Sequence, residues 1–118
     1  MRDVSNFIQF LVYCFHENHQ PFFLLDGTPV TLKFRDKERL AISLPSSLRD
    51  DQTIQEMVEA GQESDTSAVL TIRGDEFDVI RLNAEAYIEN GEKPLVTNAA
   101  DIVLSPSAVS FYCLGPVK

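Results

Sequence analysis

Two histidines stand three residues apart in the segment His16-Glu17-Asn18-His19. This spacing is close to one helical turn, so both imidazoles can face the same side and act as a pair of metal ligands. No third ligand is evident beside them, although Cys14, Glu17 or Asp26 could reach. Histidines in the last turn of a helix also have a simpler role, because their positive charge complements the negative end of the helix dipole. We expect this structural role and predict no metal site.

The two cysteines, Cys14 and Cys113, fit neither a disulfide scaffold nor a thiolate zinc site. Cys14 as a nucleophile needs an imidazole within hydrogen-bond reach, but a spacing of two residues points His16 to a different side of a helix. Its apolar neighbours are also expected to raise the pKa of the thiol and leave it inert. Cys113 alternates with apolar residues and is expected to pack in the core. We predict that neither thiol is catalytic and that both are reduced.

Carboxylates are concentrated in residues 50–101, which hold thirteen acidic and three basic residues, a net charge of -10 in a chain whose total is -8. The densest groups are Asp50-Asp51 and Asp75-Glu76 with Asp78. Paired carboxylates can serve glycosidic or phosphoryl chemistry, but these fall at an expected helix start and an expected turn, where acids stabilise the backbone or face water. The sequence has no glycine-rich phosphate loop, no Gly-x-Ser-x-Gly and no His-Glu-x-x-His. We therefore predict no catalytic residues and no cofactor.

The negative charge bears on the choice of partners. It repels phosphate backbones and anionic lipids, so direct binding to nucleic acid or to a membrane is not expected. It suits a basic protein partner or a decoy for a nucleic-acid groove, and it also simply keeps a protein soluble. One basic stripe, Lys33, Arg35, Lys37 and Arg39, could meet the acidic surface of another copy or could protect strand edges from unwanted pairing.

Residues 4–17 have the periodicity of a helix, which Asp3 or Ser5 can cap. Its main apolar stripe consists of Phe7, Ile8, Leu11, Val12 and Phe15. Phe10, Tyr13 and Cys14 lie off that stripe, so a helix on a single sheet face would leave two aromatic rings in water. Later segments of the same chain or a second chain must cover them, and we favour a second chain, hence a homodimer.

This first apolar run is unlike a signal peptide, because Asn6 and Gln9 interrupt it and no small-x-small cleavage site follows. It is also shorter than the roughly twenty residues that cross a bilayer. We therefore expect a cytoplasmic protein.

After Pro21 the pattern changes to strands. Phe22 to Leu25 ends in an Asp26-Gly27 turn, and Val30 to Phe34 and Leu40 to Leu44 alternate apolar and polar residues, with residues 36–39 closing an antiparallel hairpin between them. Pro45-Ser46-Ser47 ends the second of these strands.

The second half continues the alternation of helices and strands. Thr53 to Glu56 has the form of a capping box for a short helix before Gly61. We expect a second hairpin of residues 68–73 and 77–82, one helical turn capped by Asn83 and reaching Tyr87, and final strands at 102–104 and 108–114 separated at Ser105-Pro106-Ser107.

These elements fit one domain. A chain of 118 residues, 44% apolar and 24% charged, buries enough surface to fold without disulfides or metal. We predict a single α+β domain over residues 1–118, with the N-terminal helix packed on a curved, mostly antiparallel sheet or partly open barrel and one further short helix.

The expected helices and strands of the first half of the chain follow an order that resembles that of a known family. The helix at Asn6 to His16, the apolar Phe22-Phe23-Leu24-Leu25, the two alternating strands and the helix near Ile54 resemble the small acidic dimeric chaperones of type III secretion. The resemblance implies a dimeric chaperone. Those chaperones usually close with a long C-terminal helix, whereas this chain is expected to end in strands.

Three functions follow as hypotheses. The leading one is a non-enzymatic protein-interaction module of the adaptor, chaperone, immunity or inhibitor type, acting as a homodimer or with a basic partner. The second is a ligand-binding or enzymatic barrel with a cavity lined by Phe22, Phe34, Phe77 and Phe111 and with His16 or His19 at its mouth. The third is an acidic mimic of nucleic acid. The expected partner-binding residues are Phe10, Tyr13, Cys14, Lys33, Arg35, Asp75, Glu76 and Asp78.

Overall fold

Two helices and eight strands make up the computed structural model, which describes residues 4–63, 68–74, 77–88 and 101–117. The elements in chain order are α1 (Val4–His16), β1 (His19–Leu25), β2 (Thr28–Phe34), β3 (Leu40–Leu44), η1 (Ser46–Leu48), α2 (Gln52–Glu63), β4 (Ala68–Ile72), β5 (Ile80–Leu82), β6 (Ala84–Ile88), β7 (Ile102–Leu104), η2 (Pro106–Ala108) and β8 (Val109–Val117), where η marks a single 3₁₀ turn.

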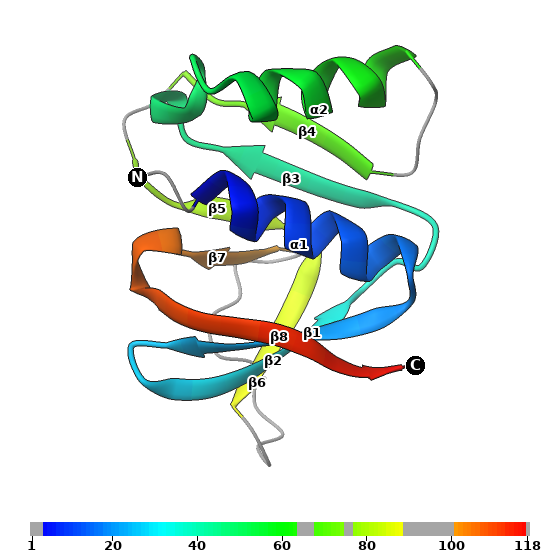
Figure 1. Cartoon of the computed structure of the whole chain (residues 1–118), viewed down its shortest axis with the longest axis vertical. Coiled ribbons are helices and arrows are strands. Elements are labelled where there is room, and N and C mark those ends of the chain that lie inside the picture. Colours follow the sequence, from blue (N-terminus) through cyan, green and yellow to red (C-terminus); the bar gives the residue numbers. More distant parts are fainter. Residues whose placement is uncertain (1–3, 64–67, 75–76, 89–100, 118) are drawn as a thin grey trace.

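The strands form two four-stranded sheets that do not close into a barrel (Figure 1). Sheet A has the order β6-β2-β1-β8 and is antiparallel throughout. Sheet B has the order β4-β3-β5-β7, and its one parallel pair is β3 with β4. A parallel pair requires a crossover connection, which η1 and α2 supply. The α+β class predicted from the sequence is confirmed.

The first helix packs against both sheets. In Figure 1 it lies between β3 of sheet B and the β1 and β8 strands of sheet A. The Phe7 ring packs edge-to-face on Phe23 of β1 with centroids 5.7 Å apart, and Phe15 packs on Phe34 of β2 at 5.3 Å. The same core contains fully buried residues of sheet B such as Ile42. Among the described residues, no helix is both long and apolar enough to cross a membrane.

The chain passes between the sheets at several places, and two of these stretches, from β2 to β3 and from β5 to β6, meet at a corner where Asn83 ties them together. The Asn83 main-chain N–H donates to the Ala41 carbonyl at 3.3 Å. Its side-chain Oδ1 accepts the Ala41 N–H at 2.7 Å, and its Nδ2 donates to the Arg39 carbonyl at 2.9 Å. The corner therefore keeps its main-chain groups paired where the regular ladders are interrupted.

The turn at Asp26-Gly27 is as predicted. Both residues have positive φ, 52° and 80°, as a two-residue hairpin between β1 and β2 requires.

Neither of the other two predicted hairpins forms. β2 pairs with β1 and β6, and β3 pairs with β4 and β5, so residues 35–39 carry the chain between sheets instead of closing a hairpin. β4 and β5 lie on opposite sides of β3 and do not pair with each other. The reason is that β3 uses both of its hydrogen-bonding edges for β4 and β5, while Leu40, Ile42 and Leu44 on its core face are all at most 1% exposed.

Two local predictions were also wrong. Residues 84–88 form a strand and not a helical turn, because Ala84 and Ala86 are buried in alternation with Glu85 and Tyr87, and because the Asn83 side chain is used at the corner. The second helix begins at Gln52, two residues before a Thr53 cap would allow, and Asp51 is the cap, with its Oδ1 accepting the Ile54 N–H at 3.0 Å.

The C-terminal strands end the chain as predicted, β7 in sheet B and β8 in sheet A. Near its end β8 comes very close to β1 at Gly115. A Cβ built on Gly115 would lie 2.1 Å from the carbonyl oxygen of Gln20, well inside contact distance.

We predict that Gly115→Ala lowers the free energy of unfolding by about 1–3 kcal/mol, because the backbone of β1 or β8 must move to admit the methyl group. Urea denaturation measures this change. Gly74→Ala is the matched control, since a Cβ there has no neighbour within 4 Å. Equal midpoints for the two variants would show that β8 does not approach β1 this closely.

We predict that Asn83→Ala costs about 2 kcal/mol of stability, because the Ala41 N–H and the Arg39 carbonyl lose their side-chain partners. Asn83→Asp keeps the acceptor and loses the donor, so its denaturation midpoint should fall between those of Asn83→Ala and the parent. An unchanged denaturation midpoint in Asn83→Ala would show that the side-chain hydrogen bonds of Asn83 do not stabilise the fold.

Candidate binding surfaces

The exposed residues of α1 form one stripe of Asn6, Gln9, Tyr13 and His16. Their spacing of three or four residues places them on one side of the helix. Only Tyr13 is large and apolar, and it is 51% exposed.

Phe10 and Cys14, the other two expected partner-binding residues of the helix, are covered by the chain itself. The Phe10 ring lies 4.6 Å from the Tyr112 ring of β8, and Cys14 is 0% exposed. Burial, with a smaller contribution from Cys113, raises the pKa of the Cys14 thiol to about 12. The last strand thus provides the cover for Phe10 that the sequence analysis assigned to a second chain, and Tyr13 remains open to a partner.

The two histidines serve different elements. His16 is exposed at the end of α1, with its ring 5.7 Å from Phe15. The His19 Nδ1 lies 3.2 Å from the Gly115 carbonyl oxygen, which links β1 to β8. Within the described part of the chain, no three metal-ligating side chains lie close enough together to hold an ion.

The basic residues Lys33 and Arg35 lie beside an acid of their own chain. Lys33 on β2 pairs in register with Glu85 on β6, and an Arg35 Nη2 lies 3.6 Å from Glu85 Oε1. The Tyr87 hydroxyl donates a hydrogen bond to the other oxygen of Glu85, and this bond raises the pKa of Tyr87. Glu85 therefore offsets part of the positive charge that this stripe presents.

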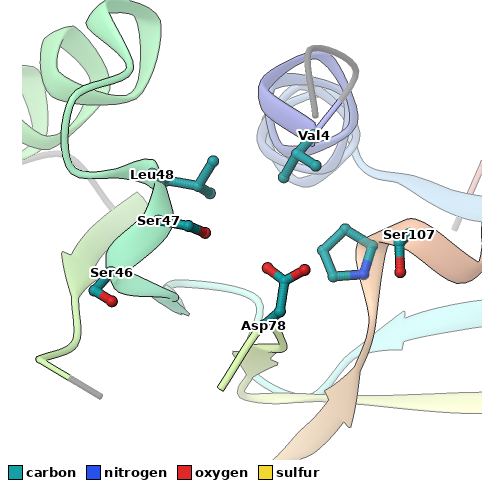
Figure 2. A pocket seen from close by; sticks show the side chains of 7 residues that line it. Val4, Ser46, Ser47, Leu48, Asp78 and Ser107 are labelled. Atoms are coloured by element: carbon teal, nitrogen blue, oxygen red, sulfur yellow. The ribbon is translucent and has the colours of Figure 1, made fainter. Parts of the chain in front are cut away.

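Asp78 is the one residue of the expected acidic group whose surroundings the structure gives; Asp75 and Glu76 lie outside the described residues. It lines a cavity of about 440 Å³ together with residues from three other elements: Val4, Ser46, Ser47, Leu48, Pro106 and Ser107. In Figure 2 the Asp78 carboxylate points into the space between η1 and η2, and Leu48 and Val4 point into the same space.

Sheet topology explains why these segments meet. β5 lies between β3 and β7 and is antiparallel to both. The C-terminal ends of β3 and β7 therefore lie beside the N-terminal end of β5. η1 follows β3, η2 follows β7, and Asp78 precedes β5. The N-terminal residue of α1, Val4, reaches the same place (Figure 2).

Arg73 fixes the backbone on both sides of Asp78. Its Nη2 donates to the carbonyls of Phe77 and Val79, each at 2.8 Å, and its Nη1 donates to the Ser43 carbonyl at 3.1 Å. The carboxylate is therefore presented on a segment anchored to β3.

The expected aromatic cavity does not form. Phe34 is buried in the core, Phe77 is 70% exposed, and Phe111 is 50% exposed. Phe22 lies half-buried on β1, and neither histidine lines the Asp78 cavity.

β8, the longest strand of the described residues, is an edge strand of sheet A and carries exposed apolar side chains. It pairs with β1 on one side, and no described strand pairs with its other side. Phe111 and Leu114 are 50% and 46% exposed, and Cys113 is also exposed. The expectation that Cys113 packs in the core is wrong, because Tyr112 takes the inward position and contacts Phe7 and Phe10.

Sequence reasoning missed the serines and the apolar walls of the cavity. The available signal was the pair of similar segments Pro45-Ser46-Ser47 and Ser105-Pro106-Ser107, which the sequence analysis treated only as strand ends. Each segment contributes residues to a 3₁₀ turn, η1 or η2, and both turns lie at the same end of the strands of sheet B.

Comparison with known proteins gave no match to a family model, a curated protein or a solved structure.

We predict that a thiol-selective reagent modifies Cys113 rapidly in the folded protein and Cys14 only on unfolding. At pH 8 the Cys14 thiol, with a pKa of about 12, is almost entirely protonated as well as buried, whereas Cys113 is exposed. Timed alkylation followed by peptide mass spectrometry measures both rates, and Cys113→Ser should abolish the fast phase. Comparable rates at the two sites would contradict the packing of α1.

Proposed function

We propose that this protein is a non-enzymatic protein-interaction module that forms a homodimer by pairing β8 with the β8 of a second copy. The observation that carries the proposal is that β8 is a long edge strand with exposed apolar side chains and no charge. Its nine residues, Val109 to Val117, contain no Asp, Glu, Lys or Arg.

Edge strands normally avoid pairing with other chains by being short, charged, bulged or covered. β8 keeps Phe111 and Cys113 exposed on the outer side of sheet A, where they pair in register with Leu24 and Phe22 of β1. Burial of the exposed part of Phe111 or Leu114 is worth on the order of 1 kcal/mol for each side chain. Pro116 and two register shifts interrupt the ladder of β8 with β1, so strand addition is favoured along the uncharged stretch from Phe111 to Leu114.

A second copy is the occupant that the uncharged and self-complementary strand favours. Each chain carries a net charge of -8, so two copies repel one another over most of their surfaces. Contact at the uncharged strand keeps like charges away from the seam. Antiparallel pairing about a two-fold axis also makes the strand its own complement, and sheet A then continues into the sheet of the other copy.

The other edge of sheet A is less suited to this role. β6 has five residues and carries Glu85, which is engaged by Arg35 and Tyr87. In sheet B the edge strand β7 has three residues, and β4 packs against α2. Short or covered edges pair poorly with other chains.

This proposal changes the expected dimer contact from α1 to β8. Phe10 is half-buried against Tyr112 and Cys14 is fully buried, and the exposed Tyr13 lies on α1, outside the proposed β8 contact. A cytoplasmic location is part of the proposal and is supported by the two free cysteines, since oxidising compartments favour disulfides.

We predict that size-exclusion chromatography with light scattering gives twice the monomer mass and that Phe111→Lys reduces it to the monomer mass. The lysine places two like charges in a desolvated seam, where they repel. Tyr13→Lys is the matched control, because it adds the same charge to an exposed aromatic position on α1. Circular dichroism must show that both variants are folded.

Spin labelling at Cys113 locates the contact independently. Two labels at this position in a β8 pair lie within about 20 Å, given a strand spacing of about 4.8 Å and a rise of about 3.3 Å per residue. The dimer should therefore show dipolar broadening that disappears in Phe111→Lys. A monomeric parent protein, or a dimer that dissociates in Tyr13→Lys but not in Phe111→Lys, would overturn the proposal.

A further inference from the structure

We propose that the cavity around Asp78 binds a cationic group carried on an aliphatic chain, which is the chemistry of a lysine side chain or of a free alkylamine. No residue of β8 lines this cavity, so the inference does not depend on the dimer.

The lining combines one charge with apolar walls. Asp78 is the only charged residue among the seven that line the cavity, and Val4, Leu48 and Pro106 are apolar and largely buried. The hydroxyls of serines 46, 47 and 107 make up the rest. A carboxylate beside aliphatic walls matches an ammonium at the end of a methylene chain, since the charge can pair while the chain packs.

The charge of the cavity disfavours anionic ligands. Among the described residues, none with a positive side chain lines the cavity, and the whole chain carries a net charge of -8. Anions such as phosphates are repelled, and cations are concentrated near the surface.

Asp78 is exposed, and the main chain on either side of it is fixed. Arg73 binds the carbonyls of Phe77 and Val79 on either side of it, so little backbone ordering remains to be done on binding. The volume of about 440 Å³ lies within the usual range of small-ligand pockets. It accommodates an alkylamine or a lysine side chain with part of its backbone.

Asp78 has one structural role that the experiment must separate from binding. Val4 begins α1 and lines the cavity, and the first turn of α1 carries no acidic residue. An acid near a helix N-terminus stabilises the helix dipole. If that is its whole role, Asp78→Asn lowers the melting temperature and no cation binds.

The binding experiment is a titration of the ¹⁵N-labelled protein, followed by amide chemical shifts. The probes are n-butylamine, an acetylated lysine methylamide, and 1-butanol as the uncharged match in size. At low salt we expect both cations to shift residues of η1, η2 and the Asp78 segment with a dissociation constant on the order of 1 mM, and butanol to shift none. Tighter binding of the lysine derivative indicates a protein partner, and tighter binding of butylamine indicates a free amine.

Three variants determine whether the carboxylate is responsible. Asp78→Asn should weaken binding at least tenfold, and Asp78→Glu should retain most of it. Glu59→Gln, which removes an exposed carboxylate of α2 outside the cavity, should leave binding unchanged. Shifts spread over the whole acidic surface, equal affinity in Asp78→Asn, or no saturable binding by the parent would overturn the inference, and none of these results depends on the oligomeric state.

Discussion

The structure depends on the corner at which two stretches of chain cross between the sheets. At this corner the main chain leaves one ladder before it joins the next, and polar groups would lose their partners without a substitute. Asn83 provides the substitute with its amide, which pairs with Arg39 and Ala41 while its own N–H pairs with Ala41. The corner lets β5 and β6 belong to different sheets although one residue separates them. Both sheets can then pack on the same helix.

Both candidate surfaces result from this arrangement. Because β5 is placed between β3 and β7, the segments that follow β3 and β7 meet the segment that precedes β5, and the Asp78 cavity lies where they converge. Because β6 returns to sheet A beside β2, the place beside β1 is left to β8 at the opposite edge. The edge strand and the cavity are thus consequences of one topology.

Local patterns in the sequence predict the elements well and their pairing poorly. The periodicity of residues 4–17 predicts α1, and the Asp26-Gly27 turn fixes the β1–β2 hairpin. The partners of β3 depend on α2 carrying the chain across to form a parallel pair, which no short-range pattern encodes. The Asp78 cavity is similarly hidden, since its lining comes from four separated segments. Asn83 shows the difficulty at one residue, because an asparagine before Ala-Glu-Ala fits a helix cap until its partners at Arg39 and Ala41 are known.

The residues of β8 separate into those with a role inside the fold and those without one. Tyr112 packs on Phe7 and Phe10, and Gly115 permits the close approach to Gln20, so the fold accounts for both. Phe111, Cys113 and Leu114 stay exposed although polar side chains would satisfy the same strand geometry. Apolar residues on an uncharged edge strand carry a risk of aggregation. The β8 contact that we propose would bury part of Phe111 and Leu114, and it is the role that we suggest for these side chains.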